Sequence, residues 1–468
     1  MAARIRAGRE SRRPLTYTRV VSSVLFPLHE LAKGHDTLRV RRFFERSQWW
    51  SAEQLELHQV ERLRTLLTRA GRKVPYYRRL FAELRLDPGS VRSPQDLEHL
   101  PFLTKDVIRR NREDLKAEGA RLRLFNTGGS TGEPLQFFIG NERVSHDVAA
   151  KWRATRWWGV DIGDPEIVVW GSPIELGAQD RVREIRDRLL RTQLLPAFEM
   201  SEMRLDEFLD RIAAARPKML FGYPSALSLI AEHAAARGRD MRSAGVKVAF
   251  VTAEQLYEHQ KKAIAEAFDC SVANGYGGRD LGFVAHECPE GGLHVTAEDL
   301  VVEIVDENGK AVPRGEEGEI VVTHLASFDF PFVRYRSGDM GTLSEWLCPC
   351  GRGLPLLEAV HGRTTDFVIA EDGTVMHALA VIYAVRDVPG IRNFKVVQED
   401  RSFTRVLLVP ENGFSHETEE KIRGRLAERL GRGVRISVER VDEIPPSASG
   451  KHRYVESRVP VPLAKRRA

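Results

Sequence analysis

The residues with the clearest chemical potential form a run rich in glycine and hydroxyls, FNTGGSTGEP, at Phe125–Pro134. Glycines let the backbone curl so that its N–H groups point inward, and hydroxyl side chains add further donors. The residues concerned are Thr127, Gly128, Gly129, Ser130, Thr131 and Gly132. Such a loop suits phosphate oxygens, although it is not a Walker A loop because Glu133 stands where that motif requires Lys. An ordinary surface turn is the alternative for this run taken alone.

A second group of side chains has the types that bind zinc. Cys288 and His294 are separated by five residues, and Cys348 and Cys350 form a C-x-C pair. Thiolates and imidazoles are the usual ligands of a closed tetrahedral zinc. The alternative is that these are ordinary reduced side chains, and His286 is a second candidate for the fourth ligand. Cys270 has apolar neighbours and is expected to be a buried small residue.

Length and composition limit the class of protein. The chain has 468 residues, of which 42% are hydrophobic, enough for a large core and two to four domains. Its 71 basic and 66 acidic residues give a net charge of only +5, which does not indicate nucleic-acid binding. Four cysteines exclude a disulfide scaffold, and no N-terminal segment has the order of a secretory signal. We therefore expect a cytoplasmic protein.

Residues 1–50 are predicted to be a basic N-terminal extension. Its apolar run, Val20–Leu31, is too short and too polar to span a bilayer. A solvated tail with a packing segment is the favoured interpretation, and a weak anchor for anionic lipid or a docking arm is the alternative. The six arginines on which the alternative depends are Arg4, Arg6, Arg9, Arg12, Arg13 and Arg19.

The elements that must position these groups alternate along the chain. The spacing of leucines over 52–70 predicts an amphipathic helix that closes at Gly71. Between about 120 and 325, short β-rich runs alternate with helical stretches, which predicts an α/β domain with a mainly parallel sheet. Strands are expected at Ile167–Trp170, Met219–Phe221, Val246–Val251, Val301–Val305 and Ile320–Thr323, and helices at 204–215, 225–237 and 255–268.

A third region begins near Gly362 and is predicted to be a small α+β domain. Strands are expected at Phe367–Ala370, Phe394–Gln398, Thr404–Val409 and Val434–Val438, with a charged helix at 416–430. The predicted architecture is α/β, with a large N-terminal domain over 51–361 and a small, mobile C-terminal lid over 362–468.

Four further motifs follow the glycine-rich loop in order: NGYGGRD at Asn274–Asp280, RYRSGD at Arg334–Asp339, HGRTTD at His361–Asp366 and PPSASGK at Pro445–Lys451. This ordered set resembles the adenylate-forming superfamily. The stretches YGGRDLGFVAHEC and CPCGR resemble its branch of phenylacetate–CoA ligases, coenzyme F390 synthetases and CapK-like proteins. The resemblance implies ATP-dependent formation of an acyl-adenylate from a carboxylic acid. The acyl group then passes to a thiol, usually that of coenzyme A.

The resemblance implies a role for each motif. The loop at Thr127–Gly132 would hold the β- and γ-phosphates, and Glu133 departs from the lysine common in the family. Tyr276 would stack on adenine while Gly277 leaves room for the nucleotide, and Asp339 would accept hydrogen bonds from the ribose hydroxyls. Arg363 would contact ribose or phosphate. Arg336 is either a nucleotide contact or a salt-bridged strand residue.

The remaining roles concern metal, catalysis and the acid. Asp280 stands where most of the superfamily has Glu and would hold Mg²⁺. Lys451 would stabilise the charge that develops on the α-phosphate, and Thr365 departs from the usual hinge aspartate. The branch also carries structural zinc with similar Cys and His ligands. Acid-pocket candidates are Tyr223, Ala253 and Glu254, with Pro224, Trp152, Trp157 and Trp158 as further candidates or as ordinary packing residues.

Two other functions stay open at this stage. An amine, a hydroxyl or a carrier protein could receive the acyl group in place of coenzyme A, as in polysaccharide or secondary metabolism. A nucleotide-binding protein without catalysis is the second, and the persistence of Asp339, Arg363 and Lys451 argues against it. The sequence does not identify the acid, and it leaves the oligomeric state open, a homodimer included.

Overall fold

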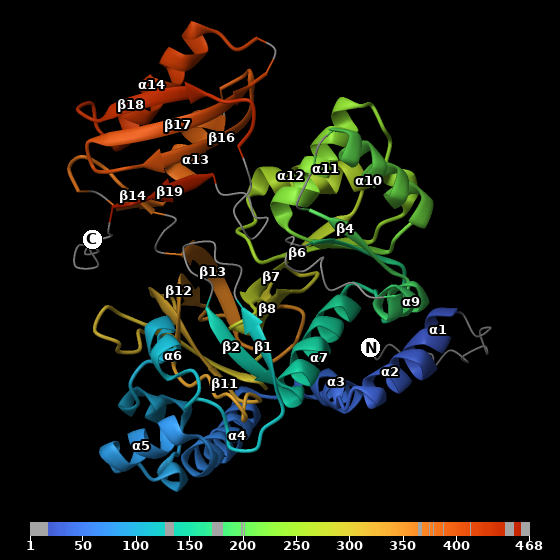
Figure 1. The fold of residues 1–468 in the computed structure, drawn as a ribbon, viewed down its shortest axis with the longest axis vertical. Helices are drawn as coiled ribbons and strands as arrows, with labels where there is room; N and C mark the ends of the chain where they lie inside the picture. The colour runs from blue at the N-terminus through green and yellow to red at the C-terminus, as the bar shows by residue number, and fades with distance from the viewer. Residues whose placement is uncertain are drawn as a thin grey trace, which may run out of the picture.

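The computed structural model describes most of the chain. The described residues are 17–126, 135–170, 181–197, 200, 202–363, 367–373, 375–377, 379–386, 388–411, 413–444 and 454–459. They form a large α/β body and a smaller α+β unit beyond residue 366 (Figure 1). Among these residues, no helix has the length and apolar character that crossing a bilayer demands.

The body is organised around one long mixed sheet. In the described chain, eleven strands are hydrogen-bonded in the order β10, β11, β12, β13, β9, β8, β7, β6, β5, β3, β4. In that order they span Leu300–Val305, Glu317–His324, Tyr335–Leu343, Leu356–Arg363, Leu293–Val295, Gly282–Glu287, Ser271–Gly278, Val248–Thr252, Met219–Gly222, Glu166–Trp170 and Thr192–Pro196.

The half of the sheet from β4 to β7 is parallel, as the alternation of strands and helices predicts. In β5, Leu220 packs into the cluster formed with α10, α11 and α12, whereas Met219 and Phe221 pack on the side of α7. Alternation along the strand thus supplies apolar side chains to both covered faces. The helices of this half are α7 (Asn141–Trp157), α9 (Arg181–Leu190), α10 (Glu202–Ala215), α11 (Pro224–Ala236) and α12 (Glu258–Phe268).

The half from β7 to β10 is antiparallel, so the expected parallel arrangement does not extend to it. Between β7 and β13 the chain passes from strand to strand without an intervening helix, all of it within described residues. A short turn can only reverse the direction of a strand, whereas a parallel pair needs a long crossover. The β7–β8 hairpin is the point where one arrangement changes into the other.

Helices pack around the N-terminal side of the body. Helix α4 begins at a capping box formed by Ser51 and Gln54 and continues through Gly71, past its expected end, to Lys73. Pro75 then occupies the first turn of α5. The N-terminal elements are α1 (Tyr17–Val20), the π-helical turn η1 (Val21–Leu25), α2 (Phe26–Ala32), α3 (Thr37–Ser47), α4 (Ala52–Lys73), α5 (Pro75–Leu84), η2 (Pro88–Ser90), η3 (Pro94–His99) and α6 (Lys105–Asn111), and a further turn, η4, spans Arg242–Ala244.

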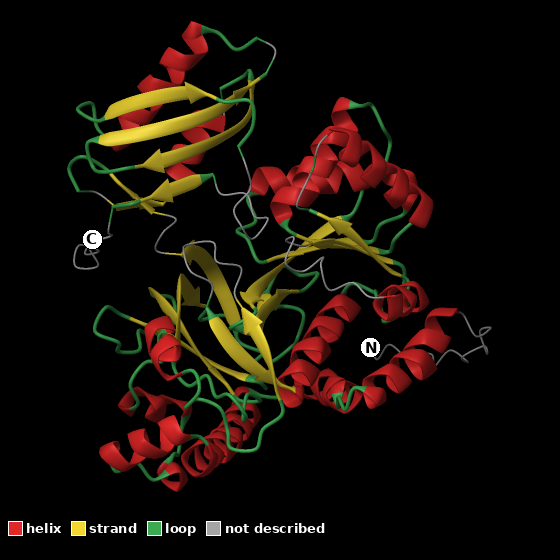
Figure 2. Cartoon of the chain, viewed as in Figure 1, coloured by secondary structure: helices red, strands yellow, loops and turns green. Residues whose placement is uncertain are grey.

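Two strands beside α6 form a separate hairpin, β1 (Leu122–Asn126) and β2 (Gln136–Gly140). The smaller unit has its own apolar core and a four-stranded sheet in the order β18, β17, β16, β19. Figure 2 shows its helices on one side of that sheet. Its elements are β14 (Phe367–Ile369), β15 (Val375–His377), α13 (Leu379–Arg386), β16 (Ile391–Gln398), β17 (Phe403–Pro410), α14 (His416–Leu430), β18 (Arg435–Arg440) and β19 (Val455–Ser457).

Candidate active site

The carboxyl ends of three neighbouring parallel strands carry the predicted acid and adenine residues. Tyr223 follows β5, Ala253 and Glu254 follow β6, and Tyr276 lies in β7. Since parallel strands end at the same edge of a sheet, these side chains are brought to one edge. Ala253 has a left-handed backbone with φ of 70°, so the chain turns sharply as it leaves β6.

Tyr276 and Asp339 form the central contact of this edge. The Tyr276 hydroxyl donates to Oδ2 of Asp339 at 2.9 Å, although the two residues lie on strands β7 and β12. The Asp339 backbone N–H donates in turn to Oγ of Ser337 at 2.9 Å. Burial and the Asp339 charge raise the pKa of Tyr276 well above its ordinary value. The phenol therefore stays protonated and orients the carboxylate.

Arg363 stands directly opposite Asp339 in the ladder between β12 and β13. The structure describes the backbone of Arg363 but not its side chain. Because β13 ends at this residue, the strand next to Asp339 is also the strand from which the chain leaves the body for the smaller unit. Asp339 and Arg363, each predicted to contact the nucleotide, are thus neighbours on adjacent strands.

Gly277 is required by the hairpin itself. A Cβ placed at Gly277 would lie 2.2 Å from the carbonyl oxygen of Gly282 in the paired strand β8. Real Cβ atoms do not approach a backbone oxygen so closely, so a larger residue would separate β7 from β8. The glycine expected to make room for a nucleotide thus also has a steric role within the sheet.

Asp280 lies in the turn between β7 and β8 and is buried. Its Oδ2 accepts a hydrogen bond from the Tyr335 hydroxyl at 2.7 Å. The buried Arg143, on α7, donates to the backbone carbonyls of Arg279 and Asp280 at 3.0 and 2.8 Å. Arg143 therefore fixes the backbone of this turn, and Tyr335 fixes the position of the Asp280 carboxylate.

Sequence reasoning did not identify Arg143 or Tyr335. A single arginine in a helix carries no distinguishing pattern, and its role depends on a turn 136 residues away. Tyr335 lies within the RYRSGD motif and follows Arg334, which has a left-handed φ of 49° and is paired with Glu303 at 2.9 Å. That motif could have drawn attention to Tyr335, because a buried tyrosine hydroxyl usually has a hydrogen-bond partner.

The structure decides between the two interpretations of Arg336. Its Nε donates to Oε2 of Glu319 at 2.8 Å, and its Nη2 contacts the same oxygen. The two residues lie on the neighbouring strands β12 and β11. Arg336 is thus a salt-bridged strand residue.

Acid-pocket candidates separate into two groups. The Tyr223 ring is buried and stacks on Trp170, with ring centroids 4.2 Å apart, and Oε2 of Glu254 accepts from the Ser225 backbone N–H at 3.3 Å. These side chains lie at the sheet edge. The indole of Trp157 instead packs against His294, and the indole N–H of Trp158 donates to the Glu287 carbonyl at 2.9 Å. Trp157, the last residue of α7, and Trp158, which follows it, are thus packing residues.

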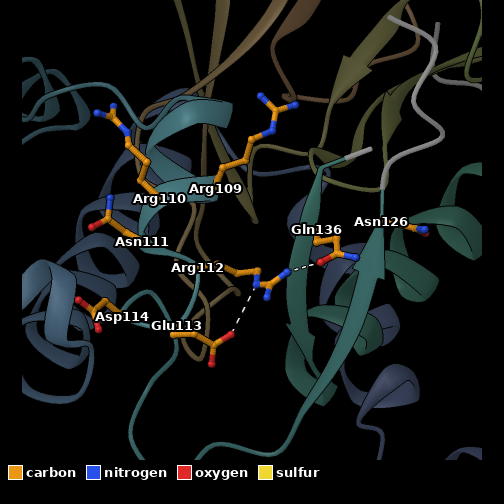
Figure 3. A pocket seen from close by; sticks show the side chains of 8 residues that line it. All are labelled: Arg109, Arg110, Asn111, Arg112, Glu113, Asp114, Asn126 and Gln136. Atoms are coloured by element: carbon orange, nitrogen blue, oxygen red, sulfur yellow. Dashed lines mark hydrogen bonds and ion pairs between the residues drawn. The ribbon is translucent and has the colours of Figure 1, made fainter. Parts of the chain in front are cut away.

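The glycine-rich loop at Thr127–Gly132 lies outside the described residues, but its flanks are described. Nη1 of Arg279 donates to the carbonyl of Asn126 at 3.2 Å, which holds the end of β1 beside the β7–β8 turn. An open cavity of about 640 Å³ lies between the hairpin and α6. Figure 3 shows the Arg109 and Arg112 side chains extending toward the hairpin and that of Arg110 turned the other way. This cavity brings basic side chains to the base of the loop.

Lys451 also lies outside the described residues, and the smaller unit to which it belongs contacts the body through described side chains. Nη2 of Arg386 lies 3.6 Å from Oε1 of Glu232, and the Tyr257 and Tyr454 rings meet edge to face with centroids 6.5 Å apart. Burial, with a smaller contribution from Arg386, lowers the pKa of His259 to about 4. The two units therefore meet near the carboxyl edge that carries Glu254.

Cys288, His294, Cys348 and Cys350 converge as the sequence predicts. Their ligand atoms all lie within 4.8 Å of one another, with Sγ of Cys350 at 3.2 Å from Nε2 of His294 and the other two sulfurs 3.6 Å apart. His286 stands opposite His294 in the β8–β9 ladder, but its ring stacks on Phe283 and does not join the group. His294 is thus the imidazole of this cluster.

The donor chemistry of the cluster fits zinc. Burial lowers the pKa of His294 to about 4, so its imidazole is neutral near neutral pH. Burial opposes ionisation of Cys350, yet hydrogen bonds from Arg352 and Cys348 lower the pKa of this thiol. Burial raises the pKa of Cys288 to about 12, and a bound cation would reverse that shift because the thiolate is the ligating form. Neutral imidazole and thiolate are the forms that zinc takes.

Comparison with known proteins agrees with this arrangement. The model of the AMP-binding enzyme family matches residues 191–327, and that of the CapK C-terminal domain matches 368–458. A phenylacetate-coenzyme A ligase of Thermus thermophilus is 25% identical over 446 residues, covering 86% of this chain and 96% of the relative. Protein CapK of Staphylococcus aureus is 24% identical over 364 residues, covering 77% of this chain and 80% of that protein.

The fold agrees as well. A crystal structure of 2-hydroxyisobutyryl-CoA ligase, in the postadenylation state with 2-HIB-AMP, aligns with a TM-score of 0.72 at 22% identity. The alignment covers 87% of this chain and 90% of that one. This likeness shows that the chain has the fold of these ligases. The two family matches and the relatives support the resemblance to the adenylate-forming superfamily and, within it, to the phenylacetate–CoA ligase and CapK-like branch.

Proposed function

We propose that this protein is an ATP-dependent, AMP-forming ligase that joins a carboxylic acid to coenzyme A. A carboxylate oxygen of the acid attacks the α-phosphorus of ATP, the bond to the β-phosphate breaks, and pyrophosphate leaves. The thiolate of coenzyme A then attacks the acyl carbon, and AMP leaves with the electrons of the broken C–O bond. The observation that carries the proposal is the Tyr276 to Asp339 contact at the carboxyl edge of the sheet.

The nucleotide would bind across this contact. The partly buried Tyr276 ring offers a flat face for adenine, and the Asp339 carboxylate can accept hydrogen bonds from two ribose hydroxyls. Arg363, opposite Asp339 in the ladder, would contact ribose or phosphate. The hydroxyl of Tyr276 acts as a positioning group because it fixes the orientation of the carboxylate.

The triphosphate would lie toward the loop at Thr127–Gly132. The family's usual lysine is replaced there by Glu133. Arg109 and Arg112 extend from α6 and the residue after it toward the base of the same loop (Figure 3). We propose that these guanidinium groups supply the positive charge that the loop lacks, because arginine binds phosphate oxygens through a planar pair of donors.

Magnesium fits the carboxylate of Asp280. Oδ2 of this side chain accepts from Tyr335, so Oδ1 is the oxygen assigned to the metal. A hard cation prefers carboxylate oxygen, and when bound it would offset phosphate charge. Lys451 is proposed to approach the α-phosphate from the C-terminal unit and to stabilise the charge of the pentavalent transition state.

Tyr223, Ala253 and Glu254 are proposed to line the acid pocket. They follow β5 and β6, the strands adjacent to the one that carries Tyr276. A small carboxylic acid placed at this edge would have its reacting oxygen beside the nucleotide, which is the arrangement that attack on the α-phosphorus needs. The aromatic stack of Tyr223 on Trp170 gives that pocket one apolar wall.

Zinc is proposed as a structural ion held by Cys288, His294, Cys348 and Cys350. When bound, it would crosslink the β8–β9 hairpin to the loop that precedes β13. Its donors are all protein side chains, which is typical of closed structural sites. All four cysteines are free thiols in the structure. A cytoplasmic location stays a prediction.

The decisive experiment measures acid-dependent exchange between ATP and pyrophosphate over a panel of aryl, fatty and amino acids, with and without coenzyme A. Exchange with one acid, and AMP release that requires coenzyme A, would support the ligase. Exchange with AMP release triggered only by an amine, a hydroxyl or a carrier protein would favour a different acceptor, for which the CapK C-terminal domain match is the supporting observation. If no acid supports exchange, the result would contradict the ligase and favour the alternative of a nucleotide-binding protein that does not catalyse a reaction.

A further inference from the structure

The helical segment formed by α1, η1 and α2 has one face against the body and one face in solvent. Val21 and Phe26 are buried, and they pack with Ile162, which follows α7. Glu30, one turn after Phe26, is also buried and accepts a hydrogen bond from the Thr37 hydroxyl. This segment is therefore a docked part of the fold.

The outward face of the same segment is apolar. Val24, Leu28 and Leu31 are spaced by four and three residues and have exposed fractions of 49%, 59% and 75%. Such spacing places the three side chains in one stripe along the helix. We call these residues the apolar stripe. Most surfaces of a protein scatter large apolar side chains singly, so a continuous row of them indicates a binding surface.

Positive charge precedes the stripe. Residues 1–16 contain Arg4, Arg6, Arg9, Arg12 and Arg13 against a single acidic residue, Glu10. Arg19 continues this charge and is exposed about one turn before Val24.

We propose that the apolar stripe and the arginines before it bind the surface of an anionic lipid bilayer. The three apolar side chains would enter the region between headgroups and acyl chains while the arginines bind lipid phosphates. Apolar burial and basic charge are the two signals that reversible membrane attachment needs together. The segment lies far from the C-terminal unit (Figure 1).

Vesicle sedimentation with the full-length protein tests this proposal. We use vesicles of phosphatidylcholine alone and vesicles that also contain phosphatidylglycerol. The stripe variant carries Leu28→Glu and Leu31→Glu, and the arm variant replaces Arg4, Arg6, Arg9, Arg12 and Arg13 by Gln. The matched control carries Leu57→Glu and Leu84→Glu, two exposed leucines on α4 and α5. Circular dichroism and ATP binding check that each variant is folded.

We expect the parent and the control to bind only the anionic vesicles, and to lose binding as salt rises. The stripe and arm variants should each bind those vesicles at least about tenfold more weakly. Three results would overturn the proposal: no sedimentation of the parent with either vesicle, equal binding of parent and stripe variant, or a stripe variant that differs from the parent only in its mass in solution. The last would assign the stripe to a second copy of the chain. None of these results depends on catalysis.

Discussion

The hydroxyl of Tyr276 lies 2.9 Å from Oδ2 of Asp339 across 63 residues of sequence. One residue is proposed to bind adenine and the other ribose, so the contact joins two parts of one nucleotide site. Two substitutions can therefore be compared. One removes the Asp339 carboxylate, and the other removes only the Tyr276 hydroxyl that orients it.

We expect Asp339→Ala to raise the KM for ATP by about tenfold or more, because hydrogen bonds to a charged acceptor contribute about 1.5–3 kcal/mol. Tyr276→Phe keeps the ring and removes only the orienting hydroxyl, so its effect should be about two- to fivefold. Pyrophosphate exchange at varied ATP measures both. An equal effect of the two substitutions would contradict the assigned division of roles.

Lys451→Ala should lower the rate of adenylation by about 100-fold or more, because it removes a cation that stabilises transition-state charge. Transfer of the acyl group from a supplied acyl-adenylate to coenzyme A should change little. Lys421→Ala, on the exposed face of α14, is the matched control. If both half-reactions fell together in the Lys451 variant, its role would be structural.

Arg109 and Arg112 should together affect the phosphates but not the acid. We expect the double substitution to Ala to raise the KM for ATP and the inhibition constant of pyrophosphate by about tenfold, with the KM for the acid unchanged. Arg110→Ala is the control, since its side chain turns away from the hairpin (Figure 3). If Arg110→Ala weakened ATP and pyrophosphate binding to a similar extent, the effect would be due to net charge and not to the positions of Arg109 and Arg112.

The Cys and His cluster should hold about one zinc ion per chain, measured by mass spectrometry of the metal. Cys348→Ser should abolish the metal and lower the Tm by several degrees, because the crosslink between β9 and the loop before β13 is lost. Cys270→Ser, outside the cluster, should retain it. Full metal content in the Cys348 variant would remove this residue from the ligand set.

His259, which stacks on Tyr257 beside the contact between the two units, is one group through which acid is expected to destabilise the fold. Burial lowers its pKa to about 4 in the folded protein, whereas the unfolded chain has about 6.5. The unfolded state binds the proton first, so stability is lost as the pH falls from about 6.5 and levels off below about 4. Between about pH 7.5 and 4.5 the parent should lose more Tm than His259→Gln. His99→Gln, at an exposed position, should behave as the parent does.

Local patterns predicted the elements of the fold, and motif order predicted much of the site. The helix at 416–430 coincides with α14, and strands expected within 301–305 and 320–323 lie inside β10 and β11. The antiparallel half was not foreseen, since strand direction depends on the connections between strands and not on the strands themselves.

The contacts that complete the site are not local. Arg143 holds the Asp280 turn from 137 residues away, and nothing in its own helix distinguishes it. Spacing favoured His294 over His286 as the fourth ligand, and the structure agrees. The two histidines are direct partners in one ladder, and it is His294 that lies with the loop of Cys348 and Cys350. The motifs therefore identified the candidate site residues, whereas contacts between distant parts of the chain determine how their side chains are oriented.

The end of α3 is joined to a segment that is made much later. Oε1 of Gln48 accepts from Nε of Arg352 at 3.0 Å, and the Gly353 backbone N–H donates to the Gln48 carbonyl at 3.0 Å. These partners are about 300 residues apart, which corresponds to about 15 to 60 seconds of synthesis. The N-terminal helices thus leave the ribosome long before their final neighbours exist. During that interval the apolar face destined for the body is available to a chaperone, and newly made chains should depend on one more than refolded chains do.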